Sequence, residues 1–530
     1  MSLEEEQIQR SRTELSTSGS DFPSDEILVV LSKVEKPGYL ATYQRVLEIC
    51  RSVKESGGRA LLVGGCVRDA MMRITPKDFD LEVYGLAAER IEKLARLHGR
   101  TSDVGKAFGI LKVFSEDGFD IDISLPRTDS KTGTGHKGFA IETDPMMSIQ
   151  DAARRRDFTI NSLAADPLTG ELFDYFGGVE DLKNRVLRIT DAERFRDDPL
   201  RVLRALQFIG RFGLRLDPDS LPVLREMAPL LSQLPKERIG EEWRKLLLKS
   251  EKPSLGLTAG MTLDVLTHLH PEFVSLSQTP QEHDWHPEGD VWVHTLMSVD
   301  EAGQIIRREE LSSDQALTVV LATLCHDLGK PQVTEMREGR ITSYGHDQAG
   351  AEPAKKFLAS IGVDGLTRDK VVGLVANHLV PTLFYIEEVV KGNKISDGAI
   401  RRLAQRIYPA TIRELILVAE ADHLGRGKFE DPENVQTLLL PTQDYPAGAW
   451  LLTRARQLEV ESSRPRDLTM GRDWLNLGFK QGTHIGRLIA LSNELREKGH
   501  TREAVLRLAY GLDTQETLDK FNLLLSSQSD

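Results

Sequence analysis

A glycine pair followed closely by two alternating aspartates constrains this chain more than any other feature. Residues 59–64 (RALLVG) are typical of a short buried strand that closes on Gly64 and Gly65. Glycines there let backbone amides approach a bound group, and the N-terminus of the short helix that follows attracts anions. Asp78 and Asp80 open the next strand-like run, and a period of two places both carboxylates on one face.

Two carboxylates on one rigid face repel each other unless a divalent cation lies between them. A glycine turn that holds phosphate beside such a pair is typical of a site for phosphoryl or nucleotidyl transfer. Either half alone is more often a plain turn or a solvated strand edge, but the two in this order favour the site. The order resembles that of the nucleotidyltransferase superfamily that includes DNA polymerase beta.

A third carboxylate and an arginine run follow. The segment 119–123 (FDIDI) alternates as a strand does, so Asp120 and Asp122 share a face. Asp122 is the better candidate for the third carboxylate of a two-metal site, and solubilising acids on an edge strand are the alternative.

The arginine run Arg154–Arg156 lies directly before Asp157 and close to Asn161. Guanidinium groups can pair with triphosphate oxygens, while Asp157 and Asn161 can hydrogen-bond a ribose hydroxyl. The alternative is a basic surface patch.

An amphipathic helix is expected over residues 193–213, with Pro199 near its start. Asp198, Arg201 and Arg204 then lie at i, i+3 and i+6 along one side. An acceptor beside a forked donor can read the Watson–Crick edge of a base, each good pairing giving about 1–3 kcal/mol of discrimination. A surface salt bridge is the alternative.

Bulk properties exclude several protein classes. The 530 residues are enough for three or four domains, and no apolar run approaches the roughly 20 residues that cross a bilayer. The first residues (MSLEEEQIQRSR) are not a signal peptide, and the 3 cysteines form neither a disulfide framework nor a zinc motif, which indicates a cytoplasmic protein. The net charge of −13 argues against indiscriminate nucleic-acid coating, but not against a local basic surface for RNA.

Taken together, the motifs resemble the class II tRNA nucleotidyltransferases, the CCA-adding enzymes. In chain order they are GGCVRD, DFD, RRRDFTINSLA, GGVEDL (177–182) and DDPLRVLRALQFIGRFG. The resemblance covers about residues 59–250. It implies untemplated addition of CMP, CMP and AMP to tRNA 3′ ends, with tRNA, CTP and ATP as partners and two Mg²⁺ ions as cofactors.

The resemblance also implies roles for individual residues. Asp78 and Asp80 hold Mg²⁺ and, with Asp122, form the catalytic set. It implies three groups of nucleotide-binding residues. Gly64, Gly65 and Arg68 lie in the triphosphate turn, with Arg156 at phosphate, and Asp157 and Asn161 contact the ribose. Asp198 and Arg201, with Arg204 nearby, act as the protein template for C and A. Two positions depart from the family pattern: Asp197 replaces a common Glu, and Gln207 replaces a common Arg, which puts one phosphate contact in doubt.

Other functions stay open. Bacterial poly(A) polymerase shares this head but usually carries a basic GRRF-like stretch and a basic tail. This chain has VGKAFGI at 104–110 and ends SSQSD, which favours the tRNA enzyme. The segment 127–139 suits the flexible loop needed to switch to A, which favours full CCA addition over a CC-only or A-only enzyme. A phosphohydrolase with a silent head and an RNA-binding regulator without activity are the remaining alternatives.

A second site follows in the chain. His294, the pair His326-Asp327 and Asp422 form an ordered nitrogen and oxygen ligand set for a divalent metal. With HPEGDVW (286–292), they resemble the HD phosphohydrolase domain of many bacterial CCA-adding enzymes. The resemblance implies that these four bind a transition metal or Mg²⁺, and that His346 and His378 extend the site to a second ion. Hydrolysis of a phosphomonoester or 2′,3′-cyclic phosphate is the implied reaction, and a vestigial tRNA-binding scaffold is the alternative.

The predicted fold is α+β: a polymerase-beta-like head with a small mixed sheet, followed by all-helical neck, HD and tail domains. The expected boundaries are a disordered tail (1–24), the nucleotidyltransferase head (25–190), the neck with the base-recognition helix (191–255), the HD domain (256–430) and a C-terminal domain (431–530). In the last of these, residues 471–486 resemble a family segment and suggest a helix–turn–helix-like contact with tRNA phosphates, with plain helix packing as an equal alternative.

Overall fold

The protein is described by a computed structural model. The structure describes residues 30–31, 38–102, 110–114, 120–131, 139–427 and 444–526. The predicted tail (1–24) lies outside the described residues, as does 104–109 of the segment compared with poly(A) polymerase. The chain divides into two compact units, one of residues 1–235 with 258–269 and the other of 236–257 with 270–530. Each unit is described by itself.

The first unit is built on a seven-stranded mixed sheet of order β3-β4-β5-β2-β1-β8-β9. Its strands are β1 (Arg59–Val63), β2 (Phe79–Tyr84), β3 (Arg100–Ser102), β4 (Ile110–Phe114), β5 (Ile121–Ser124), β8 (Ala164–Ala165) and β9 (Leu172–Phe173). β2 pairs antiparallel with β1 and parallel with β5, and this second register sets Asp80 opposite Asp122. The predicted mixed sheet with helices is confirmed.

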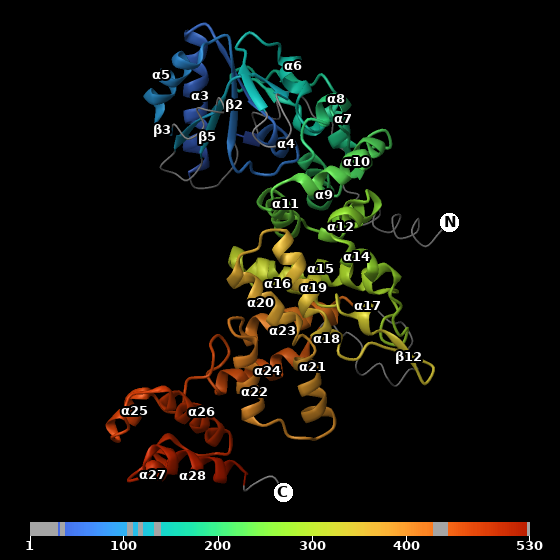
Figure 1. Ribbon diagram of the computed structural model, residues 1–530. Helices are drawn as coiled ribbons and strands as arrows, with labels where there is room; N and C mark the ends of the chain where they lie inside the picture. The colour runs from blue at the N-terminus through green and yellow to red at the C-terminus, as the bar shows by residue number, and fades with distance from the viewer. Residues whose placement is uncertain are drawn as a thin grey trace. The chain divides into compact units, whose positions relative to one another are not determined.

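Two helices, α3 (Tyr39–Glu55) and α5 (Ala88–His98), lie side by side against the sheet (Figure 1). Val46, Ile49 and Val53 recur at helical spacing on α3 and are buried in one core with the strand residues Leu62 and Leu81. Burying each such side chain contributes about 1.5–3 kcal/mol, so this layer holds the central strands rigidly. The short helix α4 (Gly65–Met71) follows β1 directly.

The predicted helix over 193–213 is wrong as one element. The structure has α8 (Ala192–Phe195), then a break, then α9 (Leu200–Phe212). Pro199, which has no N–H, occupies the N-cap position of α9, and a carboxylate oxygen of Asp198 accepts the Leu200 amide at 3.0 Å. Asp198 therefore precedes the helix instead of lying along its side.

Strands also occur where none was expected. After residue 190, β11 (Arg215–Leu216) pairs with β10 (Val186–Leu187), and β12 (Glu335–Arg337) pairs with β13 (Arg340–Thr342). Part of the expected loop 127–139 is strand as well, because β6 (Arg127–Lys131) pairs with β7 (Phe139–Thr143), while 132–138 lies outside the described residues. The remaining elements of this unit are α6 (Ile149–Arg154), η2 (Thr159–Asn161), α7 (Gly178–Lys183), α10 (Leu221–Met227), η3 (Ala228–Gln233) and α13 (Val265–Leu269).

Four helices form the centre of the second unit, where α16 (Ser313–Cys325) packs against α15 (Val291–Arg308), α20 (Gly365–Val375) and α23 (Ile412–Leu424). Capping boxes open α16 and α23, so both helix starts are fixed locally. Around them lie α11 (Lys236–Lys249), α14 (Pro271–Val274), η4 (Ser275–Gln278), α17 (Lys330–Val333), α18 (His346–Ala349), α19 (Ala351–Ser360), α21 (Val380–Tyr385), η5 (Ile386–Val390), α22 (Asp397–Ile407) and α24 (Pro446–Gln457). The helix α12 (Pro253–Thr262) begins in this unit and ends in the first.

The C-terminal helices form a separate hydrophobic cluster around the fully buried Trp474. They are α25 (Gly471–Asn476), α26 (Thr483–Glu497), α27 (Arg502–Ala509) and α28 (Thr514–Ser526). Among the described residues, no helix is long and apolar enough to cross a membrane.

Candidate active site and metal centre

The acidic group of the head lies on adjacent strands. Asp80 of β2 faces Asp122 of β5 in the parallel register, and the exposed Asp78 immediately precedes β2. Lys112 of β4 extends its Nζ to 3.4 Å from Asp122 Oδ1, yet this buried oxygen accepts no hydrogen bond. Burial raises the pKa of Asp80 to about 6, with Asp122 and Asp78 adding to the effect and Arg156 opposing it. Such a donor set suits a divalent cation held by oxygen ligands.

The glycine turn lies directly under an arginine. Gly64 has a φ of +70°, and a Cβ placed there would lie 2.6 Å from Nη1 of Arg156. Only glycine meets both conditions, because other residues rarely adopt this backbone conformation and none lacks the Cβ. Gly65 begins α4, and its own Cβ position is open apart from Arg68 at 3.6 Å.

Glu82 is a member of this site that the sequence analysis did not identify. Its carboxylate lies 2.9 Å from Arg155 and 3.6 Å from Arg156, and it accepts a hydrogen bond of 2.7 Å from the Tyr84 hydroxyl. The signal was present in the sequence, because Glu82 continues the alternation of Asp78 and Asp80 on the same strand face.

Four of the predicted nucleotide-binding residues are joined in one hydrogen-bonded chain. Arg68 donates to Asn161 Oδ1 at 2.5 Å, and Asn161 donates to Asp157 Oδ1 at 2.9 Å. Arg204 of α9 donates to the other Asp157 oxygen at 2.6 Å. Although burial opposes its ionisation, Arg204 and Asn161 hold the pKa of Asp157 below its ordinary value. The hydrogen-bonded chain links α4, the helix that follows the glycine turn, to α9.

The remaining α9 candidates contact the backbone. Arg201 donates to the carbonyl oxygens of Arg155 at 2.8 Å and Arg194 at 2.9 Å, and stacks on Phe195. Gln207, in place of the common family arginine, is buried within the helix packing. The structure thus gathers all the predicted head residues into the first unit.

The metal-ligand candidates of the second unit also converge. Nε2 of His294 on α15 lies 3.1 Å from Asp422 Oδ1 on α23 and 3.2 Å from His326 Nε2 at the end of α16. Asp327 Oδ2 lies 3.2 Å from His326 Nε2. All four side chains are buried, so one centre faces all of them.

Asp327 joins this set to the other two histidines. Its Oδ1 lies 3.3 Å from Nε2 of His346, which in turn lies 3.3 Å from Nε2 of His378. Both carboxylate oxygens of Asp327 are buried and accept no hydrogen bond. Buried carboxylate oxygens beside imidazole nitrogens that face each other suit divalent cations.

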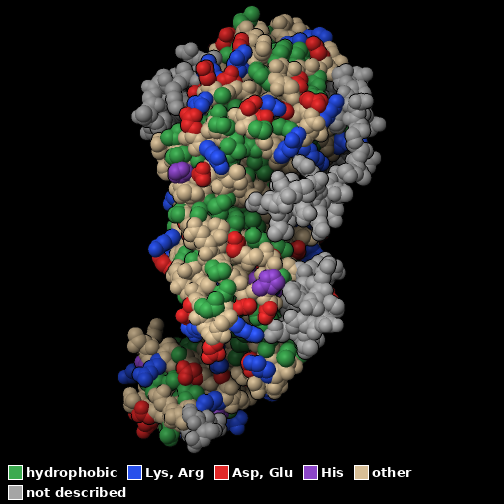
Figure 2. Space-filling view, turned by 90° about the vertical axis from the view of Figure 1, so that its right-hand side faces the viewer, with side chains coloured by type: hydrophobic (Ala, Val, Ile, Leu, Met, Phe, Trp, Pro, Cys, Tyr) green, Lys and Arg blue, Asp and Glu red, His purple; other side chains and the backbone are tan. Residues whose placement is uncertain are grey.

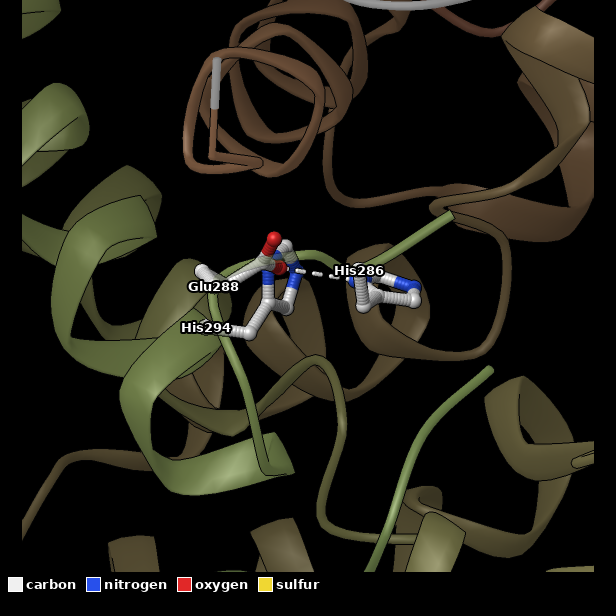
Figure 3. A group of neighbouring side chains, drawn as sticks. All are labelled: His286, Glu288 and His294. Atoms are coloured by element: carbon white, nitrogen blue, oxygen red, sulfur yellow. Dashed lines mark hydrogen bonds and ion pairs between the residues drawn. The ribbon is translucent and has the colours of Figure 1, made fainter. Parts of the chain in front are cut away.

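Residues that the sequence analysis did not single out surround this centre. Lys330 Nζ lies 2.8 Å from Asp327, and Arg426 lies 3.7 Å from Asp422. Figure 3 shows two further ones, His286 and Glu288, against His294. The H-x-E spacing of HPEGDVWVH was the available signal for them.

Charged side chains of both signs are interspersed over the described part of the face seen in Figure 2. The net charge of −13 is therefore not gathered into one acidic field on that face.

Domain families match three successive parts of the chain. Residues 60–188 match the poly A polymerase head domain, 213–276 match the probable RNA and SrmB-binding site of polymerase A, and 291–427 match the HD domain.

Solved structures with a similar fold include a CCA-adding enzyme of Thermotoga maritima complexed with tRNA, with 19% identity, a TM-score of 0.55, and 94% of this chain and 99% of that chain covered. Another is the Bacillus stearothermophilus CCA-adding enzyme in complex with CTP, with 20% identity, a TM-score of 0.55, and 90% and 93% covered. At these identities the likeness shows the fold.

Curated relatives are more similar in sequence. A multifunctional CCA protein of Stenotrophomonas maltophilia is 33% identical over 416 residues, which cover 77% of this chain and 93% of the relative. One of Xanthomonas campestris is 34% identical over 409 residues, covering 76% and 92%. The chain belongs to the family of multifunctional CCA proteins.

Proposed function

We propose that this protein builds and repairs the 3′-terminal CCA of tRNA from CTP and ATP. The observation that carries the proposal is the parallel register that sets Asp80 beside Asp122, on strands next to the glycine turn and its arginines. Family membership supports the same activity, since the curated relatives carry the name of CCA proteins.

Different residues of the head would bind the metal ions, the triphosphate and the ribose. Asp78, Asp80 and Asp122 would hold two Mg²⁺ ions, which when bound activate the attacking hydroxyl and neutralise the leaving pyrophosphate. The amides of the Gly64–Gly65 turn, with Arg68 and Arg156, hold the triphosphate in line with the tRNA 3′-hydroxyl. Asp157 and Asn161 orient the ribose.

Base choice is assigned to the start of α9. Asp198 and Arg201, with Arg204 behind them, offer acceptors and donors to the edge of C or A. The backbone contacts of Arg201 fix its guanidinium against the arginine run, so the reading group is held by the same segment that contacts phosphate. A fixed donor discriminates because a mismatched base leaves it unpaired.

Sequencing the 3′ ends of a CCA-less tRNA after incubation with CTP and ATP tests this proposal. We expect complete CCA ends, and Asp78→Ala should abolish addition while tRNA binding remains. A long A tract made from ATP alone would instead assign a poly(A) polymerase. Products that stop at CC, or addition of A only to a tRNA that already ends in CC, would assign a partial enzyme.

We propose a second, metal-dependent phosphohydrolase activity for the HD centre, acting on phosphomonoester or 2′,3′-cyclic phosphate ends. The convergence of His294, His326, Asp327 and Asp422 supports it. A transition metal or Mg²⁺ held there would supply an activated water. The variant His326→Ala/Asp327→Ala should lose this hydrolysis and keep CCA addition, whereas hydrolysis at the parental rate would contradict the assignment.

The chain's organisation is part of the proposal. We propose the division into a tail (1–24), head (25–190), neck (191–255), HD domain (256–430) and tRNA-contacting C-terminal domain (431–530). The three cysteines are free and buried, which suits a protein of the reducing cytoplasm.

A further inference from the structure

The carboxylate of Glu288 touches a predicted metal ligand without being one of the predicted ligands. We infer that Glu288 is a positioning residue that holds His294 in the tautomer and orientation that present Nε2 to a divalent metal. The inference rests on the metal centre proposed above, and it concerns the opposite edge of the His294 ring.

The two nitrogens of His294 face different groups. Nε2 faces Asp422 at 3.1 Å and His326 at 3.2 Å, whereas Nδ1 lies 2.9 Å from Glu288 Oε1. The same oxygen lies 2.9 Å from Nδ1 of His286, so it is between the two rings (Figure 3). The contact of Oε1 with His294 Nδ1 is short, but its geometry is not that of a hydrogen bond.

The partner of Nδ1 decides which nitrogen can bind a metal. An ionised carboxylate only accepts hydrogen bonds, so Glu288 at Nδ1 and Asp422 at Nε2 both attract a ring proton in the metal-free protein. A divalent cation bound by Asp422 and Nε2 would remove that competition, and Glu288 would then hold the proton on Nδ1. A carboxylate behind a metal-binding histidine fixes its orientation and raises its basicity, and loss of such a partner typically weakens metal binding by about 10–100-fold.

The other Glu288 oxygen fixes the carboxylate itself. Oε2 accepts the backbone amide of Gly427 at 2.9 Å, just beyond the end of α23, the helix that carries Asp422. A Cβ on Gly427 would lie 3.2 Å from the Glu288 amide nitrogen and 3.4 Å from Oε2. Glu288 therefore joins the segment before α15 to the segment after α23. Each of these helices carries one predicted metal ligand, His294 on α15 and Asp422 on α23.

Glutamine cannot replace this carboxylate. The Gly427 amide and the His294 Nδ1–H group both need an acceptor, and an amide side chain offers one oxygen. If that oxygen stays on Gly427, the NH₂ group faces Nδ1 of His294 and draws the ring proton to Nε2, which then cannot bind the metal. Glu288→Gln keeps the size of the side chain and removes the second acceptor, the oxygen that also contacts Nδ1 of His286.

The same three side chains could instead hold an ion of their own. With the HD centre also occupied, His294 would then have to give both nitrogens to metals, which requires the imidazolate anion. The positioning role needs no such species, and the two uses differ in the number of ions bound.

Co²⁺ titration of the full-length, metal-stripped chain in competition with a chelator tests the inference. The signal that His326→Ala/Asp327→Ala removes defines the HD centre. Glu288→Gln should weaken that Co²⁺ binding 10–100-fold without changing the number of ions. The matched control is Glu282→Gln, because Glu282 also accepts a distant backbone amide, that of Ile341 at 2.9 Å, but is not part of the metal-ligand groups.

The outcomes separate the two proposals. If His326→Ala/Asp327→Ala removes no signal, the metal centre itself is refuted. If it does, and Glu288→Gln binds Co²⁺ within threefold of the parent, the positioning role is refuted; loss of one ion with the rest bound normally would refute it too and make Glu288 a ligand. An unchanged melting temperature of the metal-stripped variant, with CCA addition retained, shows that the weaker binding is not caused by unfolding.

Discussion

Replacing Asp80 with asparagine separates the catalytic value of the acidic group from its effect on stability. Asp80 faces Asp122 across the parallel strands, and burial with its acidic neighbours raises its pKa to about 6 from an ordinary value of 3.8. Asparagine has the same shape without the charge. The variant should therefore be inactive and, in the absence of divalent cations, more stable than the parent at neutral pH.

The magnitude follows from the pKa shift of this residue. Because the pKa is higher in the folded state, the folded protein binds more protons between pH 3.8 and about 6, and the contribution of Asp80 to stability falls as the pH rises through that window. A shift of about 2 units at 1.36 kcal/mol per unit gives about 3 kcal/mol. For a unit of this size, 1 kcal/mol moves the melting temperature by about 2–4 °C, so we expect a rise of about 6–12 °C at pH 8 and almost none near pH 4.

Differential scanning calorimetry from pH 4 to 8 in a chelator measures this difference. Addition of Mg²⁺ should stabilise the parent and not Asp80→Asn, and so reduce the difference between their melting temperatures. Asp120→Asn is the matched control, since Asp120 precedes the same strand as Asp122 but pairs with Lys112 at 3.2 Å. An Asp80→Asn protein that melts below the parent at pH 8 in chelator would refute the reasoning.

Three further predictions concern the head. Gly64→Ala should raise the KM for CTP about tenfold in steady-state assays, because its methyl group meets a guanidinium 2.6 Å away; Gly177→Ala, with a φ of +77° and nothing within 4 Å, controls for backbone strain alone. Arg201→Ala should relax discrimination against UTP and GTP more than it weakens tRNA binding, and an unchanged nucleotide preference would count against the template role. Arg204→Gln removes the ion pair of the buried Asp157 and should cost about 1–3 kcal/mol in unfolding experiments at pH 7, whereas an unchanged stability would contradict the burial argument.

Local patterns predicted the parts of the fold that depend on backbone geometry alone. The period of a strand predicted one face for Asp78 and Asp80; the structure places Asp80 within β2 and Asp78 just before it. Which strand lies next to β2 depends on long-range pairing, and no local pattern in the sequence encodes it. The sequence therefore suggested Asp122 as the third carboxylate only by analogy with other two-metal sites. The sheet order of the structure sets it opposite Asp80.

The contacts that complete each site come from distant segments. Arg68 and Asn161 are 93 residues apart, and Glu288 and Gly427 are 139 apart. Their pairing follows from how helices pack, which composition and spacing do not give. The break between α8 and α9 has a local cause and could have been predicted, because Pro199 disfavours a continuous helix. The apolar periodicity on both sides of Pro199 indicated one helix instead.

The path of the chain between the units limits how the protein can be cut. It passes from one unit to the other after Pro235, again after Leu257 and once more after Leu269. A fragment that stops at residue 235 leaves out α13, whose Val265 and Leu266 are fully buried against η3 in the first unit. Such a truncation would expose a hydrophobic face, so the first unit cannot be excised as a single contiguous segment that ends at residue 235.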